Sequence, residues 1–207
     1  MHGRVLLGGV LRLSSILIAV VLLATLMPSH VAYGQGLELN TGWAYVTGNN
    51  GTDGFAVGGA WWFTKRVTLG VNYDDSWDTS PLTSFNVSSL GLVVTKSHLQ
   101  DLMIGPRIFF TADWTTKHKL IPFVENQYGY SFLDQSVRIT NVGYAEASSE
   151  KFSWILGGGA EYLLNPHWSA RINLDLLRTH FGDEGQSHLR LVLGLTYTFG
   201  PRGEAAH

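Results

Sequence analysis

The sequence predicts an all-β fold, an eight-stranded antiparallel up-and-down barrel that crosses a membrane. Eight segments alternate apolar and polar residues with the two-residue period of a strand, and turn-forming residues separate them. Only 14% of the residues are charged, against about a quarter in soluble domains. An even number of antiparallel strands can close on itself and leave no open sheet edge in lipid.

The amino-terminal segment predicts export. Arg4 and Arg12 precede an uncharged, mostly apolar run over residues 13–27, and small residues follow with the spacing of a cleavage site. A retained membrane helix is the alternative, but the run is short for a span. The expected segments are a cleavable signal peptide (1–34), the barrel (35–199) and a short carboxy-terminal tail (200–207).

The first three predicted strands are residues 37–46, 54–63 and 67–74. In the first, Leu39 and its alternate neighbours form an apolar face, and Glu38 lies on the other face. The second sets Phe, Val and Trp against Ala and Gly, and the third sets Val, Leu and Tyr against Thr, Gly, Asn and Asp. Gly- and Asn-rich residues separate the first pair, and Thr-Lys-Arg joins the second pair.

The fourth and fifth strands are predicted at residues 98–110 and 119–132. The inward face of the fourth carries Asp101 and Arg107, and its outward face carries Pro106. Because proline inside a strand removes a backbone donor, we expect a local bulge at this position. In the fifth strand, alternate Val, Tyr and Phe residues face outward, opposite Phe, Glu, Gln and Gly.

The last three strands are predicted at residues 150–163, 167–178 and 190–199. The sixth and seventh alternate bulky apolar residues with Ser, Gly, Asn and charged residues, and Asn-Pro joins them. The last strand places three alternate leucines before Tyr197 and Phe199. This face would suit hydrocarbon in its middle and a membrane interface at its aromatic end.

Two polar segments, residues 75–97 and 133–149, are predicted as long loops. The connections after the second, fourth and sixth strands are expected to be shorter than those after the third and fifth. This difference is typical of short periplasmic turns at one end of a barrel and longer external loops at the other.

Outward aromatic residues gather near the predicted strand ends, where a membrane interface favours them. A soluble barrel would also alternate, but it would expose charge on its polar face, which here is rich in Gly, Ser and Ala. The predicted aromatic girdle consists of Trp43, Tyr45, Trp61, Phe63, Tyr73, Phe110, Tyr128, Trp154, Tyr162, Trp168, Tyr197 and Phe199.

Three motifs carry a family resemblance: Gly105-Pro106-Arg107, Pro122-Phe123-Val124 and the closing strand from Gly194 to Phe199. Over about residues 37–199 the chain resembles the eight-stranded outer-membrane β-barrels, which include the OmpA-like transmembrane domain and the OmpX-like surface barrels. The resemblance implies a bacterial outer-membrane location. It also implies that periplasmic chaperones and the barrel assembly machinery are partners, with Gly194, Tyr197 and Phe199 as the assembly signal.

Several charged residues fall on the inward faces of the predicted strands. Charges inside a narrow barrel are costly unless they pair, and Glu161 with Arg171, and Arg107 with Glu125, should be cross-strand neighbours. We therefore expect a charge network that fills the lumen, since eight strands leave an interior just wide enough for side chains. Its predicted members are Glu38, Arg107, Glu125, Glu161, Arg171 and Asp175.

No catalytic or metal site is predicted. His180 and Ser187-His188 lie in a loop, and Ser97-His98 lies at a loop edge, but none of these matches a nucleophile–base arrangement. Asp74, Asp75 and Asp78 could offer oxygen ligands, yet they lack the glycine and terminal glutamate of a calcium loop. We expect no cofactor.

The leading hypothesis is a non-enzymatic, monomeric outer-membrane barrel whose external loops contact a ligand, the environment or lipopolysaccharide, or support envelope integrity. A narrow porin-like channel and a lipid A-modifying enzyme are the alternatives. The net charge of -2 and the lack of a basic run argue against nucleic acid as a partner.

Overall fold

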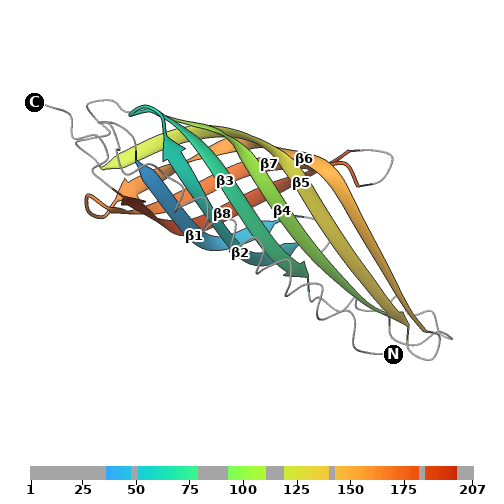
Figure 1. Ribbon diagram of the computed structural model, residues 1–207. Helices are drawn as coiled ribbons and strands as arrows, with labels where there is room; N and C mark the ends of the chain where they lie inside the picture. The colour runs from blue at the N-terminus through green and yellow to red at the C-terminus, as the bar shows by residue number, and fades with distance from the viewer. Residues whose placement is uncertain are drawn as a thin grey trace, which may run out of the picture. The chain divides into compact units, whose positions relative to one another are not determined.

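The computed structural model contains a closed barrel of eight strands, as the sequence predicts (Figure 1). Each strand pairs antiparallel with its neighbour in the chain, and β8 pairs with β1. The structure describes residues 36–47, 51–78, 93–110, 119–139, 143–181 and 185–199. The predicted signal peptide and the tail after Phe199 lie outside these residues. The strands are β1 (Leu37–Val46), β2 (Thr52–Trp62), β3 (Val67–Asp78), β4 (Val93–Phe109), β5 (Leu120–Ile139), β6 (Gly143–Leu163), β7 (Trp168–Thr179) and β8 (Gln186–Phe199).

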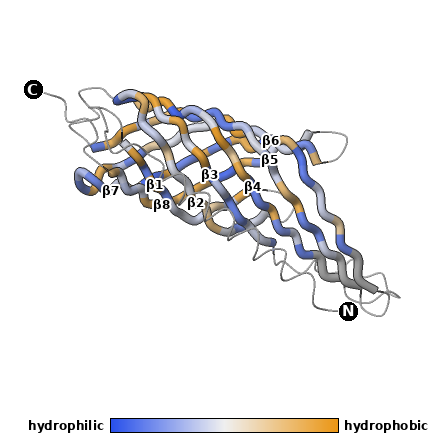
Figure 2. The backbone as a smooth tube through the Cα atoms, in the orientation of Figure 1, coloured by the Kyte–Doolittle hydropathy of each residue, from blue (hydrophilic) through white to orange (hydrophobic). Residues whose placement is uncertain are grey.

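The predicted facing of the strands agrees with the burial of their residues. In β4, buried and exposed residues alternate without exception from Asp101 to Phe109, and β7 shows nearly the same pattern. Hydrophobic and hydrophilic residues also alternate along the barrel strands in Figure 2. The polar set points into the lumen and the apolar set points outward, which is the reverse of a soluble barrel. Within the described ranges, no helix is long and apolar enough to cross a bilayer.

The prediction of a long loop at residues 133–149 is wrong. β5 continues to Ile139 and β6 begins at Gly143, so only residues 140–142 connect them. The expectation that the connection after the fifth strand is longer than those after the second, fourth and sixth is therefore also wrong, because those connections span residues 63–66, 110–119 and 164–167. No side chain of this extension whose burial the structure describes is buried, and Glu146, Ala147 and Ser148 are exposed in succession. A strand without a buried face needs no apolar alternation.

The predicted loop at residues 75–97 is shorter than expected, because β3 extends to Asp78 and β4 begins at Val93. The remaining residues of this loop, 79–92, lie outside the described part of the chain. The connection between β3 and β4 is still longer than those after β2, β4 and β6, as predicted.

The bulge expected at Pro106 is absent. Ile104 pairs with Tyr128 and Arg107 pairs with Glu125, so the register between β4 and β5 is the same on both sides of the proline. On its other side Pro106 lies opposite Leu69 of β3 without a break. Pro106 points outward and is exposed, and the strand accommodates its missing N–H without an extra residue.

β5 and β6 run past the end of β7 (Figure 1), and β4 accompanies β5 as far as the pair of Val93 and Ile139. The pairing of β6 with β7 ends at Ser153 and Thr179, but the pairing of β5 with β6 continues to Ile139 and Gly143. We call the part beyond Ser153, residues 130–139 and 143–152, the projecting hairpin. The end of the barrel that carries it is the hairpin end, and the opposite end, with the connections at 63–66, 110–119 and 164–167, is the turn end.

Candidate functional site

The lumen contains a buried charge layer in which two arginines face three glutamates. Arg107 lies 2.8 Å from Glu125 and 3.2 Å from Glu38. Arg171 pairs with both Glu38 and Glu161, and its Nε donates a 2.8 Å hydrogen bond to Glu161. Glu38 thus joins the two arginines into one connected network. All five side chains are almost fully excluded from solvent, and ion pairs offset much of the desolvation penalty that such burial imposes.

A second charge layer lies nearer the hairpin end and centres on Arg190. Its guanidinium pairs at 2.7 Å with Asp74 and at 2.7 Å with Asp175. Asp175 was predicted in the lumen, but Arg190 and Asp74 were not among the predicted members of the network. The two-residue alternation of the strands could have predicted both residues, because it places Arg190 and Asp74 on the inward face of their strands.

Amides extend the first layer toward the second. Gln127 and Asn173 donate hydrogen bonds of 2.9 Å and 2.8 Å to the two oxygens of Glu125. Asn72 in turn donates a 2.9 Å hydrogen bond to the side-chain oxygen of Gln127. Gln127 shares its Glu125 oxygen with Arg107, whereas Asn173 bonds the other oxygen of that carboxylate. Polar contacts therefore cross the lumen from β3 to β7.

Apolar layers close the charged part of the lumen on both sides. At the turn end, Phe109 packs against Trp62 at 4.6 Å and against Phe123 at 5.3 Å between ring centroids. The guanidinium carbon of Arg107 lies 5.1 Å from the centre of the Phe123 ring, in cation–π range. Nearer the hairpin end lies a buried cluster of Val46, Leu99, Met103, Ile155, Leu177 and Phe181. Neither apolar layer was predicted, although period-two alternation points Trp62 and Phe109 inward.

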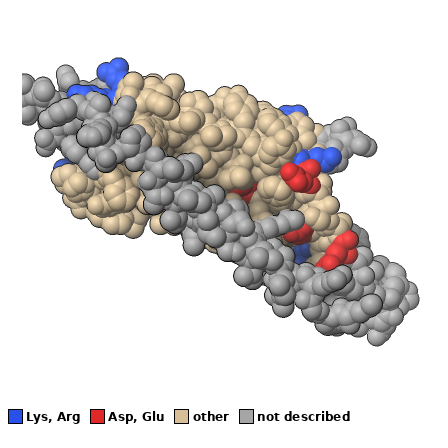
Figure 3. All heavy atoms as spheres, viewed as in Figure 1, with Lys and Arg blue, Asp and Glu red and all other residues tan. Residues whose placement is uncertain are grey.

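The outer surface of the barrel is apolar around its middle. On the face shown in Figure 3, most visible charged side chains lie toward the two ends, with an uncharged surface between them. Of the predicted girdle, the exposed aromatics are Trp43, Tyr45, Phe63, Phe110, Tyr128, Tyr162, Trp168 and Phe199, and Trp61, Trp154 and Tyr197 are half-buried.

Tyr73 differs from the rest of the predicted girdle, because its side chain is only 8% exposed. Its ring packs 6.4 Å from that of Phe55. Its hydroxyl donates a 3.1 Å hydrogen bond to Asp75, which faces the same side of β3. Tyr73 therefore contributes a local polar contact on the outer wall instead of a free interfacial ring.

Solved structures resemble this barrel. The attachment invasion locus protein Ail of Yersinia pestis matches with a TM-score of 0.55 and 14% identity, covering 80% of this chain and 99% of Ail. OprG from Pseudomonas aeruginosa matches with a TM-score of 0.54 and 9% identity, over 81% and 97% of the two chains. Neisserial surface protein A matches with a TM-score of 0.52 and 11% identity, over 82% and 98%. The chain has the fold of the eight-stranded outer-membrane β-barrels. No protein-family model and no curated protein matches the sequence.

In this outer-membrane barrel fold, β8 meets β1 at a pair of glycines. Gly194 lies opposite Gly42, and a Cβ on either residue would overlap the backbone of the facing strand. The glycines therefore let the first and last strands approach closely where the barrel closes. Tyr197, toward the turn end, packs edge to face on Trp168 at 5.0 Å and on Phe199 at 4.8 Å. The structure thus places all three residues of the predicted assembly signal on the seam.

The aspartates considered as calcium ligands do not converge. Asp74 points into the lumen toward Arg190, whereas Asp75 points to the outer wall and pairs with His98. Successive residues of a strand face opposite sides, so these two carboxylates cannot share one cation. Across the described residues, no group of three or more His, Asp or Glu side chains is arranged to hold a metal.

The candidate catalytic histidines make separate contacts. His180 Nδ1 lies 3.0 Å from the carbonyl oxygen of Phe152, and His188 Nδ1 lies 2.7 Å from that of Thr47. His98 pairs with the carboxylate of Asp75 on β3, a partner that was not predicted, and its ring stacks on Trp77 at 5.5 Å between ring centroids. The histidines contact strand ends and neighbouring rings, which suits a structural role.

Proposed function

We propose that this protein is a non-enzymatic outer-membrane protein that passes no solutes and meets its surroundings through the projecting hairpin. The layers inside the barrel support the first part. Three buried arginines and five paired carboxylates cross the lumen, and apolar clusters lie on both sides of them. Conduction would require these ion pairs to separate in a medium of low dielectric constant, which is strongly unfavourable.

The projecting hairpin is the observation that carries the second part. It extends β5 and β6 beyond the pairing with β7, and its side chains from Glu146 to Lys151 are exposed or half-exposed. A paired hairpin holds these side chains on a fixed frame, unlike an unstructured loop, so less conformational entropy is lost when a partner binds. Glu146, Glu150 and Lys151 place charges on the strand, and charged residues discourage uncontrolled pairing between edges.

The proposed orientation places the hairpin end outside the cell and the turn end in the periplasm. The chain contains no cysteine, so single-cysteine variants can test this. In intact cells, a polymer-linked maleimide too large for porins should label the variant Lys151→Cys in the hairpin and leave Lys65→Cys in a turn unlabelled. After the cells are broken, both variants should react. Labelling of Lys65→Cys alone in intact cells would reverse the orientation and remove the hairpin from the outer surface.

The absence of enzymatic activity has its own test. Mass analysis of lipid A from cells with and without the protein should give the same acyl and phosphate composition. A mass change of one acyl chain or one headgroup would replace this proposal with a lipid-modifying function.

A further inference from the structure

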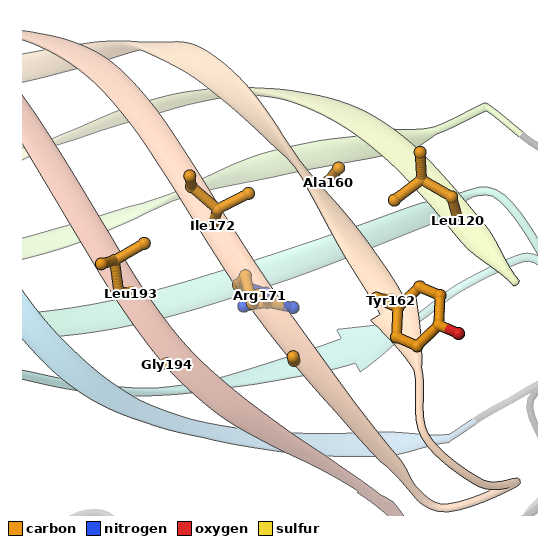
Figure 4. Close-up of a pocket in the computed structure, with 8 residues that line it drawn as sticks. Leu120, Ala160, Tyr162, Arg171, Ile172, Leu193 and Gly194 are labelled. Carbon is orange, nitrogen blue, oxygen red and sulfur yellow. The ribbon is translucent and has the colours of Figure 1, made fainter.

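The outer wall of the barrel offers apolar surface without selective chemistry. A shallow hollow of about 350 Å³ across β5 to β8 is lined by aliphatic side chains that include Leu120, Ile172 and Leu193, and by the ring of Tyr162 (Figure 4). The guanidinium of Arg171 belongs to the charge network of the lumen. Acyl chains meet such a surface on any membrane barrel, so this part of the wall does not select one partner.

One edge of the projecting hairpin, by contrast, has no strand beside it. β6 pairs with β5 as far as Gly143, but its pairing with β7 ends at Ser153 and Thr179. Within the part of the chain that the structure describes, no strand pairs with the other side of β6 between Gly143 and Phe152. We call this stretch the open edge of β6. An open edge presents backbone N–H and C=O groups with which another chain can pair.

The backbone groups that face the open edge belong to alternate residues. The Leu163 N–H donates a 2.8 Å hydrogen bond to the carbonyl oxygen of Lys119, just before β5, so odd-numbered residues of β6 turn their backbone groups toward β5. The register between β5 and β6 has no break from there to the tip of the hairpin. The even-numbered residues therefore turn their backbone groups away from β5. The N–H and C=O groups of Glu146, Ser148 and Glu150 face the open edge.

His180 caps the open edge where it leaves the barrel. Its Nδ1 lies 3.0 Å from the carbonyl oxygen of Phe152, and its ring lies 6.4 Å from the Phe152 ring. Because a carbonyl oxygen only accepts, the imidazole donates, as a backbone N–H of an adjacent strand would. From Phe152 back to Glu146 the side chains of β6 are exposed, apart from the half-exposed Ser149. This part of the edge is accessible to a partner.

The side chains of the open edge carry a charge pattern with a period of two. Glu146, Ser148 and Glu150 lie on one face of the sheet, and Asp134 of β5 pairs with Ser148 on that face. All four side chains are exposed. The exposed Lys151 lies on the other face. An incoming strand thus meets carboxylates on one face and an ammonium on the other.

We propose that the open edge of β6 binds an extended segment of a partner protein as an added antiparallel strand, and that this segment carries lysine or arginine at two positions four residues apart. This inference rests on the proposed role of the projecting hairpin. Antiparallel pairing sets residues directly opposite each other, so the two cations face Glu146 and Glu150. Backbone hydrogen bonds supply affinity, and the charges exclude strands with the wrong pattern.

The test measures the binding of two fluorescent octapeptides with capped ends by anisotropy. The protein is the full chain in phosphatidylcholine vesicles, whose lipid has no net charge. The matched peptide is Thr-Glu-Lys-Val-Thr-Val-Lys-Thr, which places both lysines on one face and its glutamate opposite Lys151. The control peptide, Thr-Lys-Glu-Val-Thr-Val-Lys-Thr, has the same composition, but its lysines lie on opposite faces. The matched peptide should bind about three- to tenfold more tightly, the effect of two cross-strand charge contacts.

The variant Ser148→Pro tests the backbone pairing. Proline removes an N–H that faces the open edge and leaves the hydrogen bonds between β5 and β6 in place. It should weaken binding of the matched peptide about tenfold, because a backbone hydrogen bond is lost and the ring obstructs the added strand. The control Ser148→Ala keeps the N–H and should bind the peptide as the unmodified protein does.

The variant Glu150→Lys tests the charge pattern. It should weaken binding of the matched peptide about three- to tenfold, since an attractive cross-strand contact becomes repulsive. A peptide with glutamate in place of the first lysine should restore the affinity of this variant. A variant that had merely lost its hairpin structure would not be rescued.

Equal affinity for the two peptides, no binding of the matched peptide, or binding that survives Ser148→Pro would overturn the proposal. Self-association of the full chain that Ser148→Pro abolishes, without peptide binding, would assign the edge to a second copy and also overturn it. These measurements do not depend on where the hairpin lies in the cell, so labelling of Lys151→Cys tests the proposed function separately. Retained gel migration before boiling verifies that each variant is folded.

Discussion

Arg171 is the position where the charge network can be tested most sharply. Its guanidinium pairs with Glu161 and Glu38, and removal of the side chain in Arg171→Ala leaves two buried carboxylates with fewer donors. Glu38 would keep Arg107 at 3.2 Å, and Glu161 would keep the Ser169 hydroxyl at 3.0 Å. A hydroxyl replaces a charged partner poorly, so most of the penalty should come from Glu161.

We expect Arg171→Ala to reduce the free energy of unfolding by about 3–5 kcal/mol, the usual effect of breaking a buried ion pair. The matched control is Lys65→Ala, an exposed cation in the turn between β2 and β3, which should change stability by less than about 0.5 kcal/mol. The assay is urea unfolding of the protein in lipid vesicles, followed by tryptophan fluorescence and by gel migration without boiling.

The double variant Arg171→Ala/Glu161→Ala isolates the pair. Glu161→Ala removes the buried carboxylate that Arg171→Ala leaves without its arginine. The double variant should therefore recover part of the lost stability, and the stability changes of the two single substitutions should not add. Equal unfolding midpoints for Arg171→Ala and Lys65→Ala, or strict additivity in the double variant, would refute the reasoning that the lumen is held by paired charges.

Three further predictions concern the wall, the apolar layer and the hairpin. Leu193→Lys should cost about 2–4 kcal/mol, because Leu193 is 44% exposed on the lipid-facing side of β8 near its middle. Leu195→Lys should cost less, because the lysine side chain can reach the headgroups. The difference in stability cost between the two lysine variants should change between thin and thick bilayers, which refolding in both measures. Phe123→Ala should destabilise the barrel by about 3–5 kcal/mol through loss of the layer at the turn end, as measured by the same urea assay. Replacement of residues 135–147 by Asn-Gly between the paired Asp134 and Ser148 should shorten the hairpin and leave the unfolding midpoint nearly unchanged; a large loss of stability would show that the hairpin is part of the barrel's folding unit.

The sequence allowed the strands to be predicted where one face meets lipid and the other faces the lumen. β7 and β1 were predicted to within one residue at each end, because burial imposes a strict period of two on their residues. The prediction failed for the extension of β5 and β6, where Glu146, Ala147 and Ser148 are all exposed and impose no apolar period on the sequence. Backbone pairing with the other strand is enough to hold this segment, and pairing leaves little trace in composition.

The contacts inside the lumen were less accessible to prediction. Alternation places Glu38 on an inward face, but only closure of the barrel brings it to Arg107, 69 residues away, and to Arg171, 133 residues away. Adjacent strands can be paired from the sequence, as in Glu161 opposite Arg171. Contacts across the lumen depend on the register of all eight strands together, which no single segment specifies.

The central claim is that these strands close into a barrel that resides in the outer membrane. The most direct measurement is fractionation of cells that express the full chain, followed by gel electrophoresis of the detergent-extracted protein with and without boiling. A closed barrel resists detergent, so the protein should be found in the outer-membrane fraction and should migrate differently before and after boiling. Recovery in the soluble fraction without detergent, with identical migration in both lanes, would contradict the account.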